Sequence, residues 1–318
     1  MAKIRFGLAL QNYIAPGESI NPRTLVKHAV RAEELGYYSV WVWDHILLGS
    51  KSVFPVHDSL MTLAAVAATT KHVRLATGIL VLSIRNPVVL AKQVATLDNL
   101  SEGRITLGVA AGWYEREFQA CGYLFSSRGQ TLQTNLEIMK RLWTESSVNG
   151  TYGQYAFKNV NMEPKPIQKP HPPLWMGGYV DTVLRRVGKR ADGWISYFYT
   201  PESFGKSWKK VLESAKVAGK NPDLFGNCDM IPIRVDQSVA EAKRIADEYI
   251  AKHCDLPKWS EATPDSSIIG TAKDCAAMIE NYSEAGVQEL VFIPSVAQLG
   301  EIEEQIEKIG KELLPSFS

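Results

Sequence analysis

The sequence predicts a single (β/α)8 barrel over residues 1–318, and three observations lead to this prediction. Eight short apolar stretches, nearly every one followed by an amphipathic stretch, run along the whole chain, as in a barrel of alternating strands and helices. Residues 73–82 and 105–111 are too apolar to be half-exposed, which is typical of parallel strands covered by helices. Several predicted strands end in small residues, which leave room for a ligand.

The clearest unit lies between residues 73 and 113. A buried strand is followed by Asn86-Pro87, which places asparagine at an N-cap and proline at the first helical position. The helix runs to about Asn99, and the next strand ends near Ala111. Two buried strands joined by a helix predict a right-handed unit with parallel strands.

The other elements follow the same alternation, with Gly36 and Gly286 ending helices and Thr271 capping one. The predicted strands are residues 4–10, 39–43, 73–82, 105–111, 174–176, 193–198, 228–235 and 289–294. The predicted helices are residues 22–35, 59–70, 86–99, 130–143, 181–190, 202–218, 239–251, 271–285 and 301–314.

Three segments are too long to be simple barrel turns: residues 113–128, 151–173 and 253–270. We expect them to be insertions near the ligand end of the barrel, the second with a small hairpin where aromatic residues alternate. The first turn, Gln11-Asn12-Tyr13, lacks a G-x-G-x-x-G motif. Its absence disfavours an open dinucleotide-binding sheet.

The composition limits the classes of partner. A formal net charge of +1 argues against nucleic acid as the main partner. The scattered Cys121, Cys228, Cys254 and Cys275 have no C-x-x-C spacing, which predicts reduced thiols in a cytosolic protein without structural zinc. There is neither a signal-peptide pattern nor an apolar run of membrane-spanning length. We therefore expect a cytoplasmic protein that binds neither nucleic acid nor a membrane.

Candidate site residues are those that follow the predicted strands, because the carboxyl ends of barrel strands carry the active site. This set contains a histidine, carboxylates, aromatic residues and glycines, without a clustered set of metal ligands or a G-x-S-x-G motif. It suits a flat aromatic cofactor with a phosphate. The set is Gln11, Asn12, Trp43, Asp44, His45, Gly78, Ile79, Gly112, Trp113, Glu115, Glu117, Gly177, Gly178, Tyr179, Tyr197 and Tyr199.

These residues also have structural interpretations. The pair Gly177-Gly178 before a helix fits a phosphate at the helix N-terminus, or a plain tight turn. His45 can hydrogen-bond a cofactor ring or move a proton, or it can be satisfied by the adjacent aspartate or the backbone. Trp113 can stack on a ring or simply pack in the protein. Glu117 can act in catalysis or complement a helix dipole.

Over nearly its whole length the chain resembles the bacterial-luciferase-like flavin and deazaflavin oxidoreductases. The segments that carry the resemblance are WVWDH at 41–45, RNPVVLAKQVATLDNLSEGRITLGVAAGW at 85–113, EREFQACG at 115–122, PPLWMGG at 172–178 and ADGW at 191–194. The resemblance implies a (β/α)8 barrel that binds FMN or coenzyme F-420 at the carboxyl end of its strands. The GVAAGW and EREF segments are most similar to the F-420-dependent branch.

The resemblance also implies residue roles. His45 matches the histidine beside the deazaflavin ring, Gly78-Ile79 matches a non-prolyl cis peptide behind the ring, and Gly177-Gly178 matches the phosphate turn. We therefore expect catalytic roles for His45, Asp44 and Glu117. The expected cofactor contacts are Asn12, His45, Gly78, Ile79, Gly112, Trp113, Gly177, Gly178 and Tyr179, with no metal.

One position departs from the family pattern, because the family's sugar-phosphate dehydrogenases have a glutamate where this chain has Trp113. A sugar phosphate is therefore disfavoured as substrate. The resemblance further implies a homodimer through the second and third helices, where the alanine-rich residues 63–68 permit close packing.

Three functions stay open from the sequence. The first is hydride transfer between coenzyme F-420 and a small organic substrate. The second is an FMN-dependent monooxygenase that uses O2 and reduced flavin from a partner reductase. The third is a non-catalytic flavin-binding barrel.

Overall fold

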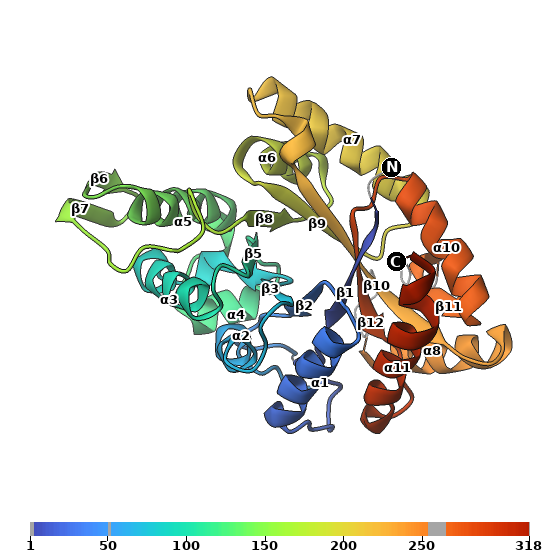
Figure 1. The fold of residues 1–318 in the computed structure, drawn as a ribbon. Helices are drawn as coiled ribbons and strands as arrows, with labels where there is room; N and C mark the ends of the chain where they lie inside the picture. Colours follow the sequence, from blue (N-terminus) through green and yellow to red (C-terminus); the bar gives the residue numbers. More distant parts are fainter. Residues whose placement is uncertain (1–2, 50–51, 254–264, 318) are drawn as a thin grey trace.

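The computed structural model describes residues 3–49, 52–253 and 265–317, and it confirms the barrel. Within these residues, parallel strands close a circuit in the order β1, β2, β3, β5, β8, β9, β10, β12 and back to β1. Helices surround this circuit (Figure 1). Across the described ranges, every helix is too short or too polar to span a bilayer.

The strands of this circuit agree with the predicted ranges to within a few residues at most boundaries, whereas the short strand at 268–270 is not among the predicted strands. The strands are β1 (Arg5–Ala9), β2 (Ser39–Val42), β3 (Arg74–Thr77), β4 (Leu80–Val81), β5 (Ile105–Ala110), β6 (Val148–Tyr152), β7 (Tyr155–Val160), β8 (Leu174–Gly177), β9 (Gly193–Tyr197), β10 (Gly226–Val235), β11 (Ile268–Gly270) and β12 (Glu289–Pro294).

The helices follow the predicted order, with the addition of the short α4. The helices are α1 (Pro22–Glu34), α2 (Ser59–Ala67), α3 (Pro87–Leu100), α4 (Glu115–Ala120), α5 (Arg128–Thr144), α6 (Asp181–Arg190), α7 (Pro201–Val217), α8 (Val239–His253), α10 (Ala272–Glu284) and α11 (Ile302–Lys308). The last predicted helix is shorter than expected, because the chain passes from α11 into a π-helical turn at Ile309–Leu313.

Two predicted helix caps are confirmed. The Asn86 side chain accepts hydrogen bonds from the backbone N–H groups of Val88 and Val89 at the start of α3. Thr271 and Asp274 form a reciprocal capping box at the start of α10. Such caps stabilise a helix by about 1 kcal/mol each, so these sequence signals fix where the two helices begin.

Glycines make room for tryptophans where the strands pack. A Cβ atom at Gly193 would lie 2.6 Å from Nε1 of Trp175, and one at Gly7 would lie 3.0 Å from Nε1 of Trp41. The two indole rings are 5.9 Å apart between centroids, and both are buried. The large tryptophan side chains thus fill the space next to glycines, which have no side chain.

The prediction of one continuous strand over residues 73–82 is wrong. β3 ends at Thr77, the peptide between Gly78 and Ile79 is cis as predicted, and β4 then pairs with β5 through Leu80 and Val109. The apolar run is continuous in sequence, but the backbone turns at Gly78. Hydrophobicity alone gives no signal for this turn, because the segments on both sides are buried.

The expected position of one insertion is also wrong. Residues 151–173 follow α5 and lead into the start of β8, so they lie at the amino end of the barrel, away from the expected ligand end. Gln168 shows this placement, since its Nε2 donates to the carbonyl of Ile105, the first residue of β5. The predicted hairpin is confirmed as the β6–β7 pair, although it begins at Val148.

The described parts of the other two insertions lie at the carboxyl ends of barrel strands. Residues 113–128 come after β5 and contain α4. Residues 253–270 follow α8, and residues 254–264 of this segment lie outside the described residues. Its last part, β11, pairs with the end of β10 at Ile233 and Val235, which places it at the carboxyl end.

Candidate active site

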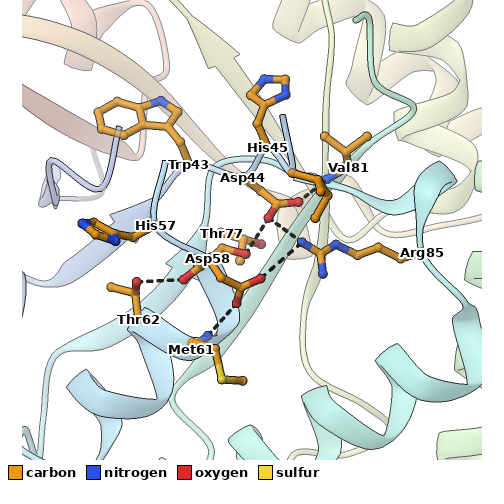
Figure 2. Close-up of polar contacts among 12 residues, drawn as sticks. Trp43, Asp44, His45, His57, Asp58, Met61, Thr62, Thr77, Val81 and Arg85 are labelled. Carbon is orange, nitrogen blue, oxygen red and sulfur yellow. Dashed lines mark hydrogen bonds and ion pairs between the residues drawn. The ribbon is translucent and has the colours of Figure 1, made fainter. Parts of the chain in front are cut away.

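His45 and Asp44 follow β2, and their side chains point in different directions (Figure 2). Asp44 is 3% exposed and lies between β2, α2 and the turn that precedes α3. Its Oδ1 accepts hydrogen bonds from Ser59 Oγ at 2.8 Å and from Arg85 Nη2 at 2.6 Å. Its Oδ2 accepts from the backbone N–H of Val81 at 3.0 Å.

These contacts favour a positioning role for Asp44. The carboxylate joins the end of β2 to β4 and to Arg85, so it fixes the backbone from which His45 projects. Removing one partner of a buried ion pair typically costs about 3–5 kcal/mol of stability. The catalytic role expected for Asp44 stays a prediction.

The hydrogen-bond partner of His45 is Glu117 on α4. Glu117 Oε2 lies 3.1 Å from His45 Nδ1, and the glutamate side chain is fully buried. Glu117 Oε1 accepts hydrogen bonds from the backbone N–H groups of Ile46 at 2.5 Å and Leu47 at 3.2 Å. The oxygens of a carboxylate accept hydrogen bonds, so we assign a proton to Nδ1 of His45. In the neutral imidazole with this tautomer, Nε2 is the acceptor.

The sequence positions Glu117 through its neighbour Phe118. Phe118 is fully buried and packs against Val81 and Ile84. Gly112 allows this approach, since it has a φ of +85° and a Cβ atom there would lie 2.8 Å from the Phe118 ring. The packing alone accounts for the glycine, and the cofactor contact expected of Gly112 stays a prediction.

Asn12 is fully buried and links the end of β1 to the residues after β2. Its Nδ2 donates to the carbonyls of Trp43 at 2.8 Å and His57 at 2.9 Å, and its Oδ1 accepts from the Trp43 N–H at 2.9 Å. These bonds use both amide hydrogens. They indicate that Asn12 shapes the site, whereas its expected contact with a cofactor is untested.

Trp113 lies beside His45 with its ring edge-on, at 5.7 Å between ring centroids. Its side chain is 42% exposed, so part of the ring is accessible to a ligand. The structure therefore brings together three residues of the predicted site, namely His45, Glu117 and Trp113.

The turn at Gly78-Ile79 is hydrogen-bonded to a residue of a strand that is not adjacent to it, Tyr197 of β9. The Tyr197 hydroxyl, at the end of β9, donates to the carbonyl of Gly78. Burial raises the pKa of Tyr197, so its hydroxyl stays a donor. A Cβ atom at Gly177 would overlap Cδ1 of Ile79, so this glycine is needed for packing whether or not a phosphate binds nearby.

The predicted phosphate turn lies between β8 and α6. Gly178 has a φ of +140°, which favours glycine, and its carbonyl accepts a hydrogen bond from Trp194 Nε1 at 2.8 Å. The cap residue of α6 is Val180, whose side chain has no acceptor for the first N–H groups of the helix. Tyr179 and Val180 are 65% and 51% exposed.

Taken together, these features fit a cofactor with a flat ring and a phosphate. An exposed helix N-terminus without a side-chain cap is a favourable place for an anion. The partly exposed Ile79 and Trp113 offer apolar surface for a ring, and His45 offers a hydrogen-bonding nitrogen.

Comparison with known proteins agrees with this chemistry. The family model of luciferase-like monooxygenases matches residues 4–309. The F-420-dependent glucose-6-phosphate dehydrogenase of Amycolatopsis mediterranei is 30% identical, covering 88% of this chain and 91% of the relative. The oxygenase component of the flavin-dependent trigonelline monooxygenase of Acinetobacter baylyi is 25% identical, covering 90% of this chain and 87% of the relative.

A solved structure has the same fold. The monooxygenase RslO1 of Streptomyces bottropensis superposes with a TM-score of 0.85 at 21% identity, covering 99% of this chain and 100% of the other.

Proposed function

Because the chain belongs to the luciferase-like monooxygenase family and is therefore an oxidoreductase, we propose that it transfers a hydride between coenzyme F-420 and a small organic substrate. The observation that carries this proposal is the pairing of His45 with the buried Glu117 at the carboxyl end of β2. A histidine held in one tautomer beside an exposed aromatic ring is suited to proton transfer next to a redox cofactor.

The protein residues have separate tasks in this proposal. Glu117 holds the His45 ring through Nδ1, and Nε2 takes up or returns the proton that accompanies oxidation or reduction of a hydroxyl or carbonyl group. Tyr197 and Asp44 position the backbone on either side of the ring site. The first turn of α6 binds the cofactor phosphate. Coenzyme F-420, when bound, supplies the hydride acceptor or donor.

Two observations support F-420 and a small substrate. The relative at 30% identity is named as F-420-dependent, and its alignment covers most of both chains. Trp113 places a large apolar ring beside His45, which suits a small, partly apolar substrate better than a sugar phosphate.

The flavin-dependent relative from Acinetobacter baylyi favours a second candidate. In that candidate the site binds reduced FMN delivered by a partner reductase and activates O2. Reduced flavin reacts quickly with oxygen, whereas a deazaflavin does not, so oxygen consumption separates the two functions.

The test uses the purified protein with each cofactor. Oxidised F-420 is mixed with a panel of small alcohols, and reduced F-420 with the matching ketones and aldehydes, while the deazaflavin absorbance is followed. In parallel, reduced FMN is supplied in aerated buffer and oxygen uptake is measured. The proposal expects F-420 turnover on some members of the panel and no oxygen uptake above that of free reduced FMN. Enzyme-dependent oxygen uptake with reduced FMN and no change in F-420 would overturn it.

A further inference from the structure

A groove lined by positive side chains runs between α5 and α6 on the outside of the barrel. It has a volume of about 370 Å³ and is lined by Gln133, Thr182, Arg185, Arg186, Lys189 and Arg190. We refer to this set as the α5/α6 groove. Four of the six residues are cationic, and none is a carboxylate.

The four cations are not paired with acids. Elsewhere on the surface, arginines lie close to glutamates, as in Arg141 with Glu145 at 2.6 Å and Arg244 with Glu241 at 2.6 Å. In contrast, among the residues that the structure describes, no acid forms an ion pair with a cation of the α5/α6 groove. Asp181, at the start of α6, pairs with Lys210 of α7 at 2.7 Å; Lys210 lowers the pKa of Asp181, and the nearby Arg185 adds a smaller effect without forming an ion pair.

The positive field in the groove is reinforced at one end. There Arg186 lies over the start of α5, since a Cβ atom at Gly129 would be 3.3 Å from its Nη2. The positive ends of the α5 and α6 dipoles add to the charge there. At the other end, Lys140 Nζ donates to the carbonyl of Arg190 at 2.9 Å. Burial is the main cause that lowers the pKa of Lys140, while the nearby Asp192 raises this pKa and Arg190 lowers it, so Lys140 is not counted among the cations of the groove.

The groove begins where the cofactor phosphate is proposed to bind. Thr182 lies in the first turn of α6, three positions after Tyr179 of the phosphate turn. From Thr182 to Arg190 the groove follows the helix axis for about 12 Å. A chain of atoms that extends from the phosphate along α6 would therefore pass the four cations one after another.

We propose that the α5/α6 groove binds the chain of carboxylates that coenzyme F-420 carries beyond its phosphate. This inference rests on the proposed function, and it also selects between the two cofactors. Coenzyme F-420 continues from its phosphate into a lactyl group and a run of glutamates, whereas FMN ends at the phosphate. The carboxylates of F-420 can pair with the four cations of the groove, whereas FMN has no carboxylates beyond its phosphate.

The experiment compares three ligands in a fluorescence titration of the whole protein: F-420 with its glutamates, F-420 without them, and FMN. At low salt, the native protein should bind the form with glutamates on the order of tenfold more tightly than the form without them. This ratio should fall as salt is added, because the groove is open to solvent. The exposed pair Arg185→Glu with Lys189→Glu should abolish the ratio and leave affinity for the shorter form within about twofold.

The matched control is Arg23→Glu with Lys27→Glu, which changes the net charge equally on α1, across the barrel from α6 (Figure 1). This control should keep the native ratio. Arg185→Ala with Lys189→Ala should give an intermediate ratio, which guards against a folding defect in the reversed variant.

Equal affinity of the native protein for both forms of F-420 would overturn the groove proposal, and so would a ratio that survives Arg185→Glu with Lys189→Glu. In that event, binding of the shorter form still supports the proposed function. Failure of both forms to bind would overturn both proposals.

Discussion

Glu117 Oε2 lies within hydrogen-bond distance of His45 Nδ1, at 3.1 Å, although the two residues are 72 positions apart in the sequence. The glutamate is fully buried, and the His45 side chain is only 11% exposed. The carboxylate decides which ring nitrogen carries the proton, and thereby which one is free to act on a ligand. The chemistry of His45 thus depends on α4, an element outside the regular barrel.

Replacing Glu117 by glutamine should disturb this arrangement. An amide can either donate to or accept from Nδ1, so His45 should lose its single tautomer, which NMR of nitrogen-labelled histidine detects without a substrate. Turnover on the substrate found by the panel should fall by roughly 10-fold or more, with cofactor affinity nearly unchanged. The effect of Glu117→Gln should largely vanish in a His45→Ala background, because both changes act through one group.

Glu115→Gln is the control, since this neighbouring glutamate on α4 is exposed. It should leave the tautomer and turnover unchanged. An unaltered tautomer in Glu117→Gln, or additive losses in the double variant, would show that Glu117 does not act through His45.

The phosphate site at the start of α6 is tested at Val180. The residue has a capping conformation, with φ of −82° and ψ of 146°, and it is half-exposed. Val180→Asp should supply a cap and a negative charge, and should weaken the binding of F-420 and FMN by roughly tenfold or more by repelling the phosphate. Val180→Asn supplies a similar cap without the charge, so it should bind both more tightly than Val180→Asp. Equal affinities of the two variants would place the phosphate elsewhere.

This pair of variants is a sharper test than bulk at Gly177. A larger side chain at Gly177 would displace Ile79, so it would disturb the ring site and the phosphate turn together.

Two buried carboxyl groups should make stability depend on pH. Burial raises the pKa of Asp229 and of Glu289. The native protein therefore keeps protons that the unfolded chain releases above about pH 4, so the free energy of unfolding should fall as pH rises from there through the native pKa values. The free energy of unfolding is measured in urea at several pH values. Its decrease with pH should be smaller in Asp229→Asn than in the native protein, and unchanged in Glu213→Gln, where the glutamate is exposed. Parallel curves for Asp229→Asn and the native protein would contradict the account.

The expected homodimer through α2 and α3 remains a proposal, and exposed apolar side chains on these helices support it. Met61 is 62% exposed on α2, and Val89 is 55% exposed on α3. Met61→Glu should shift sedimentation toward the monomer at micromolar concentration, because a charge would be buried in the interface. Val217→Glu, at an 83% exposed position on α7, should not. The same oligomeric state in both variants would exclude this interface.

The sequence predicts the barrel well because each strand and helix carries a local signal. Residues 290–294 are apolar throughout and lie in β12, and the Asn86-Pro87 pair and the Thr271 cap mark the starts of α3 and α10. The predicted position of residues 151–173 is wrong because the length of a segment does not show which end of the barrel it covers.

The site was predictable only in part. The ends of strands identify His45, and the family resemblance identifies Gly78-Ile79. The partners that hold them are long-range pairs, Glu117 with His45 and Tyr197 with Gly78, and no local pattern indicates which side chains meet across the barrel. The pairing of Arg85 with Asp44 has no signal in the sequence for the same reason.

The proposed use of coenzyme F-420 by this barrel is tested most directly by two separate titrations of the purified protein, one with each cofactor. Bound cofactor is removed and identified by mass spectrometry, and F-420 and FMN are then titrated separately by fluorescence. The account predicts saturable binding of F-420 that is tighter than that of FMN and weaker in Val180→Asp than in Val180→Asn. Tight binding of FMN, with little or no binding of F-420, would contradict it.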